Sequence, residues 1–131
     1  MMSKTLIYAV NTATQSIADG GTINFGNVIR KYGCLSISGG NVSTNCDGYY
    51  DIDVNLTVSG TAAGTANVQV YSNGTALPGA IATVPTTATS VTSVCIPTVI
   101  RQKCCVPCNI TVIVSGTSVN ITNSSIRVVK E

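Results

Sequence analysis

The chain has 131 residues and a formal net charge of +2, and only 9% of its residues are charged. An ordinary soluble protein has about 25% charged residues. The seven basic residues are scattered, so we expect neither a nucleic-acid partner nor a polybasic membrane patch. The length suits one domain over residues 1–131, with residues 1–20 as a candidate N-terminal strand or arm.

The first residues carry a positive charge and a short apolar run from Leu6 to Val10, and polar Asn11 follows at once. A secretory signal needs a longer apolar core and a cleavage site, and this segment has neither. No apolar run approaches the ~20 residues of a membrane-spanning helix. We therefore expect a first strand here, no signal peptide and no association with a membrane.

Short runs rich in Val, Ile and Thr recur along the chain, and no run has the 3.6-residue period of a helix. About ten strands are predicted, at residues 6–10, 22–29, 35–38, 42–44, 49–58, 66–72, 80–84, 90–96, 110–114 and 119–129. Gly40 and the glycine before it mark a two-residue hairpin, and residues 60–64 and 77–79 are predicted loops. Regularly spaced short strands without helices predict an all-β antiparallel sandwich or barrel.

One long predicted strand, residues 49–58, alternates strictly between apolar and polar side chains from Tyr50 onward. Successive side chains of a strand point to opposite faces, so this strand has one buried and one exposed face. The apolar side consists of Tyr50, Ile52, Val54, Leu56 and Val58, and the polar side of Asp51, Asp53, Asn55 and Thr57. We expect Val54 in the core and Asn55 at the surface.

This strand is followed by a Gly/Ala-rich loop and then by Val68-Gln69-Val70-Tyr71, which ends at Asn73-Gly74. The order resembles the C1q/TNF-like jelly roll, most closely over residues 48–73 and more loosely from about Ile23 to the end. The resemblance implies a jelly-roll-like antiparallel β-sandwich that forms homotrimers and serves as a scaffold or binding head. Because tryptophan and a collagen-like repeat are absent, the chain resembles heads on bacteriophage virions and bacterial surface filaments more than complement or cytokine members.

The function that this resemblance implies is structural or adhesive. We expect a trimeric head fibre, decoration or tail-spike head of a bacteriophage, located in the virion and contacting a capsid or tail protein or a cell-surface glycan. One alternative is the trimeric head of a bacterial surface or spore filament at the cell surface. A second alternative is a small zinc- or redox-active cysteine protein. The low charge favours the two trimeric head functions, since a closed oligomer would bury surface that is prone to association.

The chain has no histidine, which removes the usual general base of nucleophilic catalysis and the commonest metal ligand. Asp51 and Asp53 lie on one strand face about 7 Å apart. As a glycosidase pair they lack any asymmetry between acid and base. As a calcium site they would need further oxygens, for which Asp47 is the nearest candidate. We favour a solvent-facing polar stripe and expect no enzymatic activity and no cofactor, with calcium and zinc as the alternatives.

Six cysteines fall into two groups. Cys34 and Cys46 flank the hairpin, and pairing outward from its turn places Cys34 opposite Asn45, so a cross-strand disulfide with Cys46 is the candidate pairing. The second group consists of Cys95, Cys104, Cys105 and Cys108. These four thiolates could form a tetrahedral zinc shell, but further disulfides, free thiols and thiol redox chemistry are the alternatives. A virion oxidised after cell lysis would reconcile disulfides with the missing signal peptide.

Two further clusters are candidate sites. Residues 101–103 add positive charge beside the cysteines, which would lower thiol pKa values, but we favour a solvated loop tip. Tyr49, Tyr50 and Tyr71 could line a sugar-binding face. We favour packing in the core or between subunits, where a tyrosine contributes apolar area and one hydrogen bond.

Overall fold

The computed structural model describes residues 5–38, 40–102 and 108–130. This part of the chain contains eleven strands and no helix, and therefore no helix that could cross a membrane. The strands are β1 (Leu6–Asn11), β2 (Gln15–Ile17), β3 (Asn27–Tyr32), β4 (Leu35–Ser38), β5 (Asn41–Thr44), β6 (Gly48–Gly60), β7 (Gly64–Ser72), β8 (Thr75–Thr86), β9 (Val91–Gln102), β10 (Asn109–Ser115) and β11 (Val119–Lys130).

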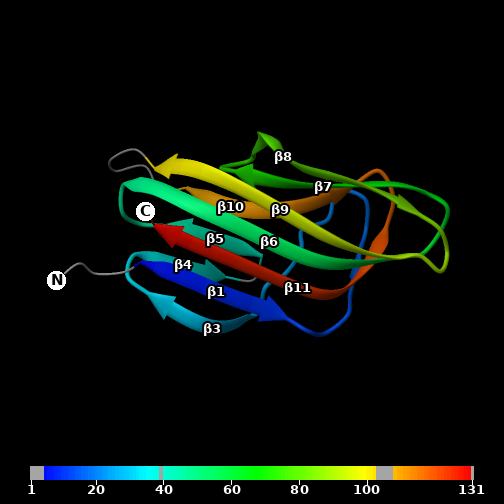
Figure 1. The fold of residues 1–131 in the computed structure, drawn as a ribbon, viewed down its shortest axis with the longest axis horizontal. Helices are drawn as coiled ribbons and strands as arrows, with labels where there is room; N and C mark the ends of the chain where they lie inside the picture. The colour runs from blue at the N-terminus through cyan, green and yellow to red at the C-terminus, as the bar shows by residue number, and fades with distance from the viewer. Residues whose placement is uncertain (1–4, 39, 103–107, 131) are drawn as a thin grey trace.

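The strands form two antiparallel sheets that pack face to face as a sandwich (Figure 1). Sheet A has the order β3-β1-β11-β6-β9, and β2 also pairs with β11. Sheet B has the order β4-β5-β10-β7-β8. After β3 the chain crosses repeatedly between the sheets, because β4, β5, β7, β8 and β10 lie in sheet B whereas β6, β9 and β11 lie in sheet A. Such repeated crossing is typical of a jelly roll. The prediction of an antiparallel jelly-roll sandwich is confirmed.

The long strand β6 is an interior strand of sheet A, with β11 on one side and the edge strand β9 on the other (Figure 1). Its alternation matches the predicted register: Val54 is fully buried and Asn55 is exposed. Val54 lies between Ile126 of β11 and Ile96 of β9, and both of these side chains are also buried. The apolar stripe of β6 is therefore part of the core between the sheets.

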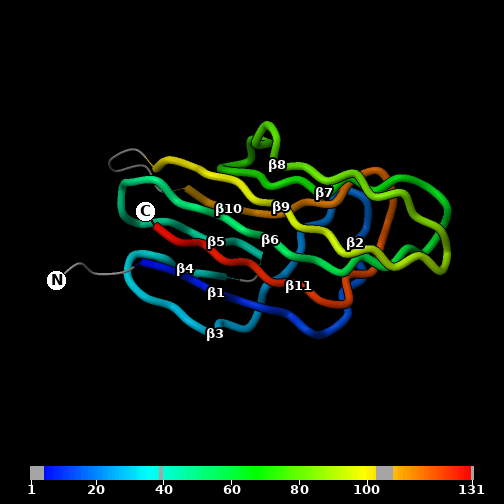
Figure 2. Tube along the Cα trace, viewed as in Figure 1, coloured from blue at the N-terminus to red at the C-terminus, as the bar shows by residue number. Residues whose placement is uncertain are grey.

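Two differences from the predicted strands lie near the start of the chain. The short strand β2, visible in Figure 2, was not predicted, because three residues carry too little periodicity. Residues 22–25 were predicted as strand, but they make only one isolated bridge, Thr22 to Ile113. This segment hydrogen-bonds to the part of β10 that β5 leaves uncovered, since β5 pairs only with Asn109 and Ile110.

Two further differences occur at prolines. Residues 77–79 were predicted as a loop, but they lie inside β8, where a register shift relative to β7 accommodates Pro78. Strand β9 was predicted to end at residue 96, yet it continues past Pro97 to Gln102. Both strands lie at a sheet edge, where a residue without an N–H costs no ladder hydrogen bond.

Candidate functional site

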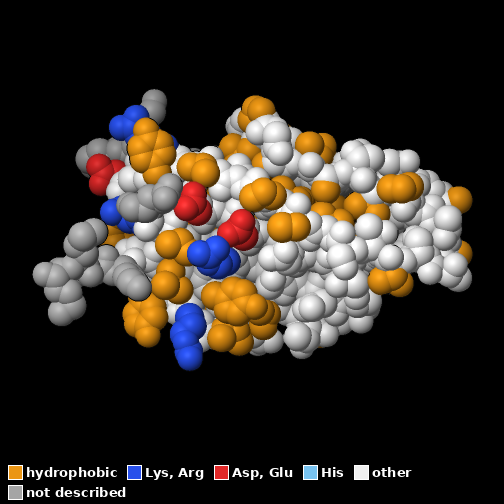
Figure 3. Space-filling model, viewed as in Figure 1, with side chains coloured by type: hydrophobic (Ala, Val, Ile, Leu, Met, Phe, Trp, Pro, Cys, Tyr) orange, Lys and Arg blue, Asp and Glu red, His pale blue; other side chains and the backbone are white. Residues whose placement is uncertain are grey.

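The outer face of sheet A is divided into two unlike halves. Figure 3 shows hydrophobic and charged side chains gathered in the left half of this view, whereas the right half is mostly uncharged and polar. In contrast, the five strands of sheet B contain no charged residue at all. The charged residues of the described strands therefore all belong to sheet A.

The two strand carboxylates both lie on the outer face of sheet A, as predicted. Asp53 accepts a 2.8 Å hydrogen bond from the guanidinium of Arg127 on the neighbouring strand β11. Since 57% of the Arg127 side chain is exposed, this ion pair contributes little to stability. Asp51 has no ion pair among the described residues.

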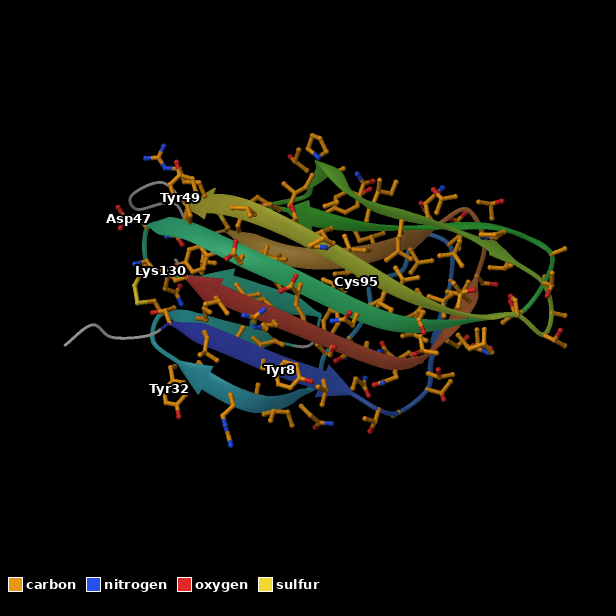
Figure 4. The ribbon with its side chains drawn as sticks, viewed as in Figure 1. Tyr8, Tyr32, Asp47, Tyr49, Cys95 and Lys130 are labelled. Atoms are coloured by element: carbon orange, nitrogen blue, oxygen red, sulfur yellow. A yellow bond between two sulfur atoms is a disulfide. The ribbon has the colours of Figure 1, made fainter. Side chains whose placement is uncertain are left out.

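The carboxylates do not assemble into a metal centre with the other described residues. Asp47 precedes β6 at the end of the sandwich (Figure 4). No group of three or more Asp, Glu or Cys side chains with metal-binding geometry occurs within residues 5–38, 40–102 and 108–130. We therefore derive no metal chemistry from this face.

The first cysteine pair forms the expected disulfide. Cys34 and Cys46 are bonded, with their Cα atoms 5.6 Å apart. The amide of Asn45 donates a 2.8 Å hydrogen bond to the Cys34 carbonyl, which confirms the predicted position of Cys34 opposite Asn45. The bond ties together the two arms of the β4–β5 hairpin.

The structure does not bring together the second cysteine group. Cys95 is exposed on the outer face of β9, whereas Cys108 is buried and its thiol donates a 3.8 Å hydrogen bond to the Arg101 carbonyl. Positions 95 and 101 are six residues apart on one strand, which is about 20 Å. Cys95 therefore cannot share a zinc shell with Cys108. The predictions for Cys104 and Cys105 fall outside the described residues.

The tyrosines do not form one surface. Tyr49 is 53% exposed with the Arg101 guanidinium 5.6 Å above its ring, Tyr50 is fully buried, and Tyr71 lies in sheet B. The prediction of a loop tip at residues 101–103 is wrong for Arg101 and Gln102. Arg101 and Gln102 end β9, and Gln102 is buried because the strand alternation turns it inward. Lys103 falls outside the described residues.

Tyr50 is held at one end of the core. Its hydroxyl donates a hydrogen bond to the carbonyl of Cys46, next to the disulfide. Burial raises the pKa of Tyr50, and the nearby Cys108 thiol and Asp47 carboxylate raise it further when they are ionised. The protonated phenol is therefore the form that the folded state favours.

We expect this raised pKa to lower stability in strong alkali. Above the ordinary tyrosine pKa of about 10 the unfolded chain loses this proton while the folded chain keeps it, so the free energy of unfolding falls as pH rises. Absorbance titration should show a tyrosine ionisation step above pH 10 that Tyr50→Phe lacks. Tyr49→Phe, which changes the exposed neighbour, should keep the step. Loss of the step in both variants, or in neither, would contradict this assignment.

Comparison with known proteins supports the fold at low sequence identity. No protein-family model matches the chain, and no curated protein matches its sequence. Murine APRIL at pH 5.0 superposes with a TM-score of 0.77 at 15% identity, covering 98% of this chain and 99% of that chain. The globular domain of zebrafish complement 1qA gives 0.67 at 9% identity, covering 95% and 94%. The PRD1 vertex protein P5 gives 0.60 at 13% identity, covering 99% of both chains. The chain therefore has the C1q/TNF-like jelly-roll fold.

Proposed function

We propose that this chain is a structural or adhesive protein that works as a homotrimeric head on a bacteriophage virion. The observation that carries the proposal is the outer face of sheet A, which exposes large apolar side chains such as Tyr8, Tyr32 and Val99. A chain with so few charges gains most by burying such a face against further copies of itself.

The likeness to the PRD1 vertex protein P5 supports a place on a virion, because that structure is a phage vertex protein of the same fold. The uncharged outer face of sheet B is suited to contacts that need no ion pair. Its polar groups include Asn67, which accepts a 3.1 Å hydrogen bond from Thr83 on the next strand. We place contact with a capsid or tail protein, or with a neutral cell-surface glycan, on this face.

Trimerisation is the part of the proposal that can be measured most directly. Light scattering of the purified chain at micromolar concentration should give about 40 kDa, which is three times the chain mass of 13.4 kDa. The trimer should persist in 0.5 M salt if apolar burial dominates, since salt screens exposed charges but not apolar contacts. A monomer over the whole micromolar range would contradict the homotrimer.

The virion location needs a separate experiment. Particles from the phage that carries this gene should contain the chain in stoichiometric amounts by mass spectrometry, and antibody against it should label intact particles in electron micrographs. Recovery of the chain only from host cell surfaces would instead favour the filament-head alternative. Absence of the chain from both the particles and the host cell surface would contradict the virion proposal.

A further inference from the structure

The registers of sheet A align its outward side chains in rows across five strands. One row crosses from β3 to β9 at a single level and consists of Arg30, Tyr8, Arg127, Asp53 and Pro97. The next row toward the end of the sheet consists of Tyr32, Leu6, Val129, Asp51 and Val99. Side chains at paired positions share a face, so both rows lie on the outer face of sheet A. Figure 3 shows hydrophobic and charged side chains gathered on the left of this face. The same face therefore carries both apolar and charged groups.

The β3 side of this face is basic and aromatic. Strand β3 is the edge of sheet A, and all six of its residues are exposed. The guanidinium of Arg30 donates a 3.2 Å hydrogen bond to the carbonyl of Ile29, and Tyr32 is 57% exposed. Figure 4 shows Tyr32 on the edge strand β3 and Tyr8 further along on the neighbouring strand β1. Arg30 has no carboxylate partner within the described part of the chain, so this side presents an unpaired cation and two exposed rings.

The β9 side of the face is hollowed and acidic. A depression of about 410 Å³ is lined by Asp51, Asp53, Arg127, Pro97, Thr98 and Val99. Arg127 is already paired with Asp53, which leaves Asp51 as the carboxylate without a partner among the described residues. Val99 is 57% exposed beside it. The depression therefore offers one free anion and an apolar wall.

The two sides complement each other but cannot meet within one chain. Asp51 lies on β6, three strand spacings of about 4.8 Å from β3, so about 14 Å separates the two strands across the sheet. Arg30 and Asp51 also belong to different rows, and this separation is too large for Arg30 to reach Asp51 of its own chain. In a second copy of the chain, however, the acidic β9 side is available to the basic β3 side of the first copy.

We propose that the β3 edge of one copy docks against the β9 side of the next, with Arg30 entering the depression to pair with Asp51 and Tyr32 packing on Val99. The contact joins two different surfaces of identical chains, so each copy contributes its β3 edge to one neighbour and its depression to the other. Such contacts form a closed ring when the rotation between neighbouring copies is that of a symmetric oligomer. This interface rests on the homotrimer proposed above and assigns the residues that form it.

The test uses charge reversal measured by light scattering over a concentration series. Arg30→Asp and Asp51→Arg each place like charges together at every contact, and each should raise the trimer dissociation concentration by about tenfold or more. The double variant Arg30→Asp/Asp51→Arg restores opposite charges and should recover the trimer. Lys31→Asp is the matched control, since Lys31 pairs with buried Ile7 and therefore faces away from this surface.

The outcomes distinguish a failure of this interface from a failure of the homotrimer itself. A monomeric wild-type chain would overturn the homotrimer and this interface together. A trimeric wild type whose single reversals remain trimeric would overturn the interface alone and leave the homotrimer standing. Dissociation in both single variants without recovery in the double variant would show that Arg30 and Asp51 do not face each other. Far-UV circular dichroism should show that all variants keep the β spectrum, because every substituted side chain reaches the surface.

Discussion

Val54→Asp is expected to prevent the chain from folding. Val54 is fully buried in the middle of β6, between Ile126 and Ile96 on the two flanking strands. A carboxylate at this position would lie between the apolar side chains of Ile126 and Ile96, and burying it unpaired would cost several kcal/mol. Since a domain of this size is stable by only about 5–15 kcal/mol, the loss would remove most of its stability. The variant should be insoluble or lack the β spectrum by circular dichroism.

The neighbouring substitution Asn55→Asp is the matched control. It introduces the same carboxylate one residue further along β6, but on the exposed face. Its melting temperature should stay within a few degrees of wild type, because surface substitutions usually change stability by less than about 0.5 kcal/mol. Equal damage from both substitutions would mean that the register of β6 is wrong, since the two side chains would then not differ in burial.

The sequence predicts the fold well where the two-residue period is long and uninterrupted. β6 was predicted with its buried face correct, because a long run of alternating residues leaves no doubt about register. Prediction fails where local signals disagree with the sheet, as at Pro78 and Pro97, which edge strands tolerate. It also fails at β2, which is defined by its pairing with β11 and not by its own sequence.

The candidate site is less accessible to sequence analysis, because it depends on which strands become neighbours. The hairpin disulfide could be predicted, since both cysteines flank one turn and the register follows from that turn. In contrast, Asp53 and Arg127 are 74 residues apart, and nothing local indicates their ion pair. The row that joins Arg30 to Pro97 likewise exists only once β1, β11 and β6 are placed between β3 and β9.

Reduction of the chain is expected to lower its melting temperature. The bond between Cys34 and Cys46 spans a sequence separation of 12 and restricts the unfolded hairpin. Closing a loop of this size is worth up to about 3 kcal/mol, which corresponds to a shift on the order of 10 °C for a chain of this length. The fold should survive, because the core between the sheets does not include the bond.

The double variant Cys34→Ala/Cys46→Ala isolates this effect from the other cysteines. It should melt at the temperature of the reduced wild type, and reductant should not lower it further. Cys95→Ser, at the exposed thiol of β9, should behave like wild type with and without reductant. A further drop of the double variant on reduction would reveal a second disulfide among the remaining cysteines. A chelator separates the zinc alternative: destabilisation by chelator, with no effect of reductant, would contradict the disulfide and indicate a metal-bound fold.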